Sequence, residues 1–217
     1  MVPTERPQSP TEELANAASH ALGLLLAIAS LPVLVDFAAR HGSVVNVVGA
    51  SVFSATMILV YFASALYHAL PPGRAKRWCN TLDHVAIYLF IAGSYTPFVL
   101  GRAPEEWRWS LLCLVWALAF VGVLLKLAHR LNDPWLSTAL YVALGWLAVI
   151  VGRPMLEGIS ATGLAWLLAG GAAYMIGVVF FLLDSRLRFA HFVWHLFVLA
   201  GSTCHFFAAW GHAIRMA

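Results

Sequence analysis

The chain has 217 residues, of which 61% are hydrophobic and only 11% are charged, and its mean hydropathy is +0.81. So few charges would not cover the surface of a water-soluble globule of this size, so the composition excludes that class and predicts an integral membrane protein. The formal net charge of +3 is small and gives no argument for a nucleic-acid partner.

The N-terminal residues 1–12 (MVPTERPQSPTE) are polar, contain proline and carry charges of both signs. They predict a short disordered lead rather than the basic start of a signal peptide. The first apolar run is therefore expected to be retained as a membrane span. We assign residues 1–15 to a polar lead and residues 16–217 to a single transmembrane domain.

Seven apolar runs of membrane-crossing length follow, and most of the prolines and basic residues lie in or beside the loops between them. The expected spans are 16–38, 44–70, 81–101, 107–128, 135–152, 160–183 and 190–213. None alternates as a strand would, and a barrel needs an even number of shorter segments. The predicted fold class is all-α, a seven-transmembrane helix bundle.

Basic residues set the expected orientation. With the N-terminus in the cytoplasm, eight basic residues face that side: Arg6, Arg74, Lys76, Arg77, Lys126, Arg130, Arg186 and Arg188. Five face the other side: Arg40, Arg102, Arg108, Arg153 and Arg215. The bias predicts a cytoplasmic N-terminus and an external C-terminus.

His191 and His195 lie within the last apolar run, four residues apart. On a helix this spacing places both rings on one face, about a turn apart, as a single metal ion requires. Histidine is costly inside a membrane, so the pair is a functional-site hypothesis by default. The alternative is that the rings only form hydrogen bonds with neighbouring helices.

Other polar candidates fall in the same leaflet when the spans are threaded in order. Ser64 and His68 are expected at the cytoplasmic end of the second span, and Asp83 in the first turn of the third. The first span opens on that side with Glu13, Asn16 and His20, which either cap the helix and join a hydrogen-bond network or orient the histidines. The sequence thus predicts a metal site near the cytoplasmic leaflet.

Three neutral imidazoles, from His68, His191 and His195, would leave one tetrahedral position open, as in a catalytic rather than a structural zinc site. Asp83 could act as general base on a metal-bound water, and Ser64, one turn before His68, could stabilise an oxyanion. The alternatives are an interfacial role for His68, helix capping for Asp83 and a bond to its own helix for Ser64.

Small residues recur every four positions on the sixth run, at Ala165, Ala169, Ala173 and Gly177. Such a stripe predicts a close helix-packing seam.

The chain resembles the hemolysin III family, the bacterial branch of the progestin and adipoQ receptor proteins. The motifs that carry the resemblance are "EELANAASHALG", "SALYH", "LDHVAIYLFIAGSYTPF" and "HFVWHLFVLAGSTCHFF". The resemblance implies seven transmembrane helices in a bacterial inner membrane, zinc held by His68, His191 and His195, and Asp83 close to the metal water. The spacing of Ser64 and His68 is also similar to that of the alkaline ceramidases, which implies amide-hydrolysis chemistry.

These observations favour a zinc-dependent intramembrane hydrolase of a lipid amide or ester, because the reactive linkage of a membrane lipid lies near the headgroup boundary. The alternative is a non-enzymatic sensor or cytolytic protein with a structural zinc, although the sequence offers no fourth His or Cys at the expected depth. A transporter or channel is a third class, and sparse polar residues elsewhere in the spans argue against it.

Overall fold

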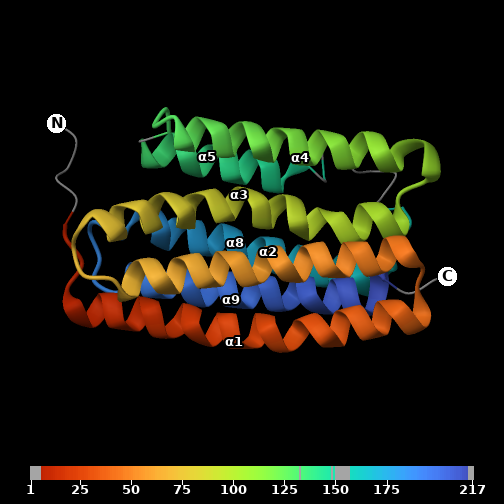
Figure 1. Ribbon diagram of the computed structural model, residues 1–217, viewed down its shortest axis with the longest axis horizontal. Coiled ribbons are helices and arrows are strands. Elements are labelled where there is room, and N and C mark those ends of the chain that lie inside the picture. Colours follow the sequence, from red (N-terminus) through yellow and green to blue (C-terminus); the bar gives the residue numbers. More distant parts are fainter. Residues whose placement is uncertain (1–5, 132, 148, 150–156, 215–217) are drawn as a thin grey trace.

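The computed structural model describes residues 6–131, 133–147, 149 and 157–214 (Figure 1). This part of the chain is helical and contains no strand. The helices lie side by side along one direction, and α1 starts at the opposite end of the bundle from the end of α9 (Figure 1). The fold of the described residues is therefore all-α.

Six helices are long and apolar enough to cross a membrane. They are α1 (Pro10–His41), α2 (Val44–Ala69), α3 (Arg74–Arg102), α4 (Glu105–Leu127), α8 (Ala161–Leu182) and α9 (Ala190–Ala208), the last continued by the π-helix η1 (Ala209–Ala213). They confirm six of the seven expected spans. A further described helix, α5 (Pro134–Gly145), has 12 residues, and residues 148 and 150–152 of the fifth expected span lie outside the described residues.

Two helices begin earlier than the apolar runs suggest. Ser9 caps α1 in a reciprocal box with Glu12, so residues 10–12 are helical, although composition assigned them to a disordered lead. Proline is tolerated at the first helical position, because a backbone N–H there would have no hydrogen-bond acceptor within the helix. Helix α3 begins at Arg74 after Gly73, because the segment "RAKRW" is rich in good helix formers.

This early start decides one alternative for Asp83. The N-cap of α3 is Gly73, and Asp83 lies nine positions after the first residue of the helix, Arg74. The capping interpretation of Asp83 is therefore wrong, and the placement in the first turn is corrected to the third turn.

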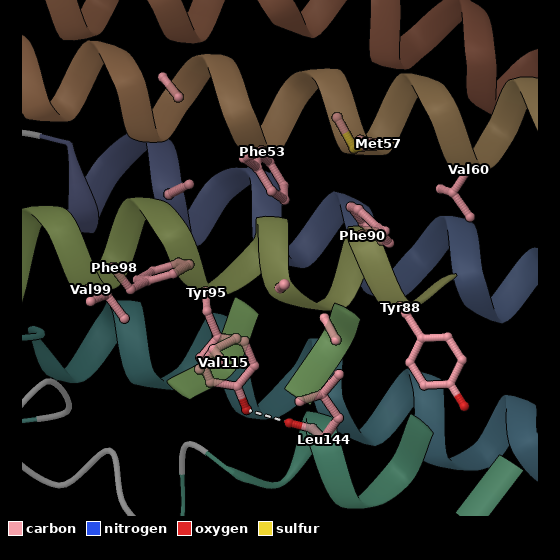
Figure 2. Packing of buried hydrophobic residues seen from close by; sticks show 14 of the residues in the cluster. Phe53, Met57, Val60, Tyr88, Phe90, Tyr95, Phe98, Val99, Val115 and Leu144 are labelled. Atoms are coloured by element: carbon pink, nitrogen blue, oxygen red, sulfur yellow. Dashed lines mark hydrogen bonds between the residues drawn. The ribbon is translucent and has the colours of Figure 1, made fainter. Parts of the chain in front are cut away.

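The core is centred on the contact between α2 and α3. An added Cβ on Gly49 would lie 2.8 Å from the Cα atom of Pro97, so the two backbones touch there and a larger residue would force them apart. Phe53 of α2 packs against Phe90 of α3 with ring centroids 6.0 Å apart, and Tyr95 of α3 donates a hydrogen bond to a carbonyl of α5 (Figure 2). Helices α2 and α3 thereby form a rigid support for the ends that carry Ser64, His68 and Asp83.

The seam between α8 and α9 is made of glycines. The buried residues of α8 are Gly163, Gly170 and Gly177, spaced seven apart. An added Cβ on Gly170 would lie 2.5 Å from the Nδ1 atom of His205 in α9. Ala165 and Ala169 are exposed, so the expected alanine stripe is wrong at these positions. Glycine lets α9 approach α8 more closely than alanine does, so the glycine face of α8 is the one that packs against α9.

Candidate metal centre

Three histidines meet at the end of the bundle where α2 ends and α9 begins. His68 is the penultimate residue of α2, and His191 and His195 lie in the first two turns of α9. One ligand atom from each lies within 4.8 Å of the others. His68 and His195 are buried, and His191 is half-buried. Residues that are 123 positions apart in the sequence, His68 and His191, thus lie close enough together with His195 to be able to hold one metal ion.

The three rings are tilted against one another. Ring centroids lie 5.0 Å apart for His68 and His191, 5.0 Å for His68 and His195, and 4.7 Å for His191 and His195. The interplanar angles are 58°, 72° and 65°. Since the free lone pair of an imidazole lies in the ring plane, three planes at these angles can converge on one point.

Carboxylates occupy one nitrogen on two of the rings. The Nδ1 atom of His68 lies 2.7 Å from Oε2 of Glu13, and Nδ1 of His191 lies 3.0 Å from Oδ2 of Asp184. A carboxylate accepts the N–H of a neutral imidazole and leaves the other nitrogen with a lone pair, which is the usual outer contact of a metal-binding histidine. The Nε2 atom of His68 is buried without a hydrogen-bond partner among the described residues.

The third ring is held by α1. The Nδ1 atom of His195 lies 3.2 Å from the carbonyl oxygen of Asn16 and 3.1 Å from Oγ of Ser19. The Ser19 hydroxyl donates to the same Asn16 carbonyl at 2.8 Å, so its oxygen is free to accept from His195. All three Nδ1 atoms are therefore engaged, and the three Nε2 atoms are the donors left for an ion. Imidazole donors suit zinc, copper, iron or nickel.

The two expected catalytic residues stand beside this group. Ser64 is buried one turn before His68 in α2. Asp83 of α3 is half-buried, lies beside Ser64 and is within electrostatic range of His191. The possible metal-ligating group found among the described residues does not include Asp83. Its carboxylate is thus near the histidines but separate from the three nitrogen donors.

Sequence reasoning anticipated one part of this site and missed another. Glu13 binds His68 and also Nζ of Lys76 at 2.9 Å, and the capping box of α1 uses Ser9 and Glu12, so the contacts of Glu13 favour the expected orienting role over capping. Asp184 and Ser19 were not singled out. Asp184 precedes His191 by seven residues across a turn, where helical spacing carries no information. An acidic residue close before a membrane-embedded histidine was the available signal.

A buried carboxylate also fixes the start of α9. Oε1 of Glu12 accepts the backbone N–H of Phe189 at 2.8 Å, and Arg6 binds the same carboxylate at 2.6 Å. The hydrogen bond to Glu12 raises the pKa of Arg6 above its ordinary value. Phe189 caps α9 with φ of 58°, a left-handed conformation that is uncommon for a bulky residue. Glu12 thus anchors the turn that positions His191.

Comparison with known proteins matches almost the whole chain. The sequence pattern of the family described as haemolysin-III related covers residues 8–206. Hemolysin-3 of Bacillus cereus is 39% identical over 204 residues, which is 94% of this chain and 93% of that protein. The Hemolysin-3 homolog of Bacillus subtilis (strain 168) is 37% identical over 205 residues, covering 94% of this chain and 96% of that protein.

A more distant relative is human. The monocyte to macrophage differentiation factor of Homo sapiens is 27% identical over 218 residues, covering 94% of this chain and 85% of that protein. No solved structure matches. The match over residues 8–206, together with the two Bacillus relatives, shows that this integral membrane protein belongs to the haemolysin-III-related family.

Proposed function

We propose that the protein is a zinc-dependent intramembrane hydrolase that acts on a lipid amide or ester. One observation carries the proposal: the ligand atoms of His68, His191 and His195 lie within 4.8 Å of one another, and each Nδ1 atom already has another partner. Three nitrogen donors with a fourth position left for a non-protein ligand are typical of catalytic zinc sites.

Zinc held by these three histidines would supply Lewis acidity towards a carbonyl oxygen and would lower the pKa of water at the site. Asp83 would accept the proton of the attacking water, because its carboxylate lies beside Ser64 and within range of His191 without belonging to the ligand group. Ser64 would hold the Asp83 carboxylate in place or donate to the developing oxyanion.

We further propose that the protein forms one transmembrane domain that crosses the membrane seven times, with α5 and the residues after it as the fifth crossing. Support comes from Ser160, just before α8, which binds His212 of η1, so that α8 starts at the end of the bundle opposite the three histidines. The proposal includes a cytoplasmic N-terminus, which would put the site in the inner leaflet of a bacterial plasma membrane. A membrane lipid is the natural substrate, because its amide or ester linkage lies at this depth.

A second candidate is a cytolytic or sensor protein in which zinc is structural. The names of the two Bacillus relatives favour it, since both are called hemolysins. A group of three histidines, with no fourth ligand found among the described residues, favours the enzyme, because structural zinc sites are usually closed by four protein ligands.

A lipid assay separates these functions. Purified zinc-loaded protein is incubated with a panel of ceramides, phospholipids and N-acyl lipids, and the products are measured by mass spectrometry. We expect release of a fatty acid by the wild type, none by the double variant His191→Ala, His195→Ala, and normal release by His41→Ala, an exposed histidine at the last residue of α1. Lysis of erythrocytes without hydrolysis of any lipid in the panel would favour the cytolytic function.

A further inference from the structure

A fourth histidine lies against the metal centre. His20 of α1 is 4% exposed, and its ring stacks on that of His195 with centroids 3.5 Å apart and an interplanar angle of 10°. The edge of the same stack is closed by Tyr61 of α2, whose ring stands at 84° to His20 with centroids 5.1 Å apart. The expectation that no fourth histidine occurs at this depth is therefore wrong.

The stacked geometry argues against His20 as a fourth ligand. A ring nitrogen binds a metal along its lone pair, which lies in the plane of the ring. Two rings that are nearly parallel and 3.5 Å apart do not direct their lone pairs at one point. An ion in the plane of His195 would thus lie far out of the plane of His20. Among the described residues, the ligand group contains only the other three histidines.

Its hydrogen bonds alone leave the ring of His195 free to rotate about one axis. Asn16 and Ser19 hold its Nδ1 atom, which fixes the direction of one edge but lets the ring swing about the line to that contact. A swing would carry Nε2 out of line with the nitrogens of His68 and His191. The flat face of His20 blocks this motion on one side, and His20 shares its helix with both partners of Nδ1.

We propose that His20 is a positioning residue of the metal centre, which holds the plane of the His195 ring so that its Nε2 atom points at the ion. The inference rests on the proposed metal site but not on hydrolysis. Neither nitrogen of His20 forms a well-aligned hydrogen bond within the described part of the chain, although the main chain of His195 is near. Stacking is therefore the contact that matters, and another flat ring can replace it.

Three variants in the full-length protein test the role. His20→Phe keeps a flat ring, His20→Leu keeps most of the volume without one, and His20→Ala removes both. Zinc affinity is measured by competition with a chromophoric chelator, and the visible absorption spectrum of the cobalt-substituted protein reports the geometry of the ligands. Melting of the metal-free forms in detergent separates loss of folding from loss of the site.

We expect His20→Phe to bind one zinc with wild-type affinity and to keep the wild-type cobalt spectrum. His20→Leu and His20→Ala should still bind one zinc, with affinity weaker by about 10-fold to 100-fold, the usual cost of losing an outer contact of a ligand. Their cobalt spectra should change, while the melting temperature of metal-free His20→Leu stays close to that of the wild type.

Other outcomes overturn the inference. If His20→Phe loses zinc as completely as His195→Ala, His20 is itself a ligand. If His20→Leu matches the wild type in affinity and spectrum, the stack is not needed. If the wild type binds no metal at all, the proposed metal site fails and the role of His20 fails with it. Failure of the lipid assay with a normal zinc site would leave the role of His20 intact.

Discussion

The Nδ1 atom of His191 lies 3.0 Å from Oδ2 of Asp184, across the turn that joins α8 to α9. The contact resembles that of His68 with Glu13, although the two carboxylates come from different parts of the chain. In each pair the carboxylate accepts the imidazole N–H and leaves Nε2 with its lone pair. The site therefore has acidic outer contacts on two of its three histidines.

Removal of one such contact should lower the affinity of the site for zinc. We expect Asp184→Ala to weaken zinc affinity by about 10-fold to 100-fold while keeping one ion per chain. Asp184→Asn should lose less zinc affinity, because the amide oxygen can still accept a hydrogen bond from His191. Asp36→Ala is the matched control, since Asp36 is exposed and pairs with Arg40 one turn further along the same helix. Equal affinity in Asp184→Ala and the wild type would contradict the orienting role.

Removing a ligand itself should lower the zinc content much more than removing an outer contact. We expect the wild type to purify with one zinc per chain, and His191→Ala or His195→Ala to lose most of it, because two protein ligands are too few for a stable tetrahedral site. Elemental analysis of the purified proteins measures the stoichiometry. Chelation of the wild type should lower its melting temperature, since the metal binds only the folded state. Stoichiometric zinc in the double variant would refute the ligand assignment.

Asp83 distinguishes a catalytic from a structural site. We expect Asp83→Asn to keep its fold and its zinc but to hydrolyse a responsive lipid about 100-fold or more slowly, the usual scale for losing a general base. Asparagine is nearly isosteric and can still bind Ser64, so packing around α3 should be unaffected. Zinc content and melting temperature serve as controls. Unchanged hydrolysis by Asp83→Asn would remove Asp83 from the chemistry.

Membrane topology provides a test that is independent of chemistry. Because His68 and His191 share one site, the loop after His68 and the loop before His191 must lie on the same face. Reporter fusions after Arg77 and after Arg188 should both report the cytoplasm, and a fusion after Glu105 should report the opposite side. Opposite locations for the first two fusions would rule out the shared site.

Glu12 should contribute to stability through several buried contacts. Its carboxylate accepts from Arg6, Ser9 and the Phe189 backbone. Glu12→Ala would leave these donors without their acceptor, which we expect to destabilise the fold by about 1–3 kcal/mol per buried group left unsatisfied. Glu12→Gln should lose less, since glutamine also serves in a capping box. Thermal unfolding in detergent measures the effect.

The control for this prediction is Glu105→Ala, which removes an exposed acidic residue from the first turn of α4. We expect that variant to melt close to the wild type. A melting temperature for Glu12→Ala equal to that of Glu105→Ala would mean that the contact with Phe189 adds no stability.

The sequence by itself determined the class of this protein and most of its helices. Long apolar runs predict spans because a helix satisfies its own backbone hydrogen bonds, and only a helix or a closed barrel can do so in a bilayer. The meeting of His68, His191 and His195 at one end of the bundle also followed from the sequence, since each span reverses the direction of the one before. These predictions depend on local composition and on counting.

The tertiary structure decided what local patterns do not encode. Asp184 approaches His191 across a turn, and Ser19 and His20 approach His195 from another helix, so no spacing in the sequence marks them. The start of α3 at Arg74 moved Asp83 away from a capping position. The partners of a buried polar group depend on how the helices rotate and pack against one another. Close contacts, such as that of Gly170 with His205, set this packing, because the interior leaves no space for a larger side chain there.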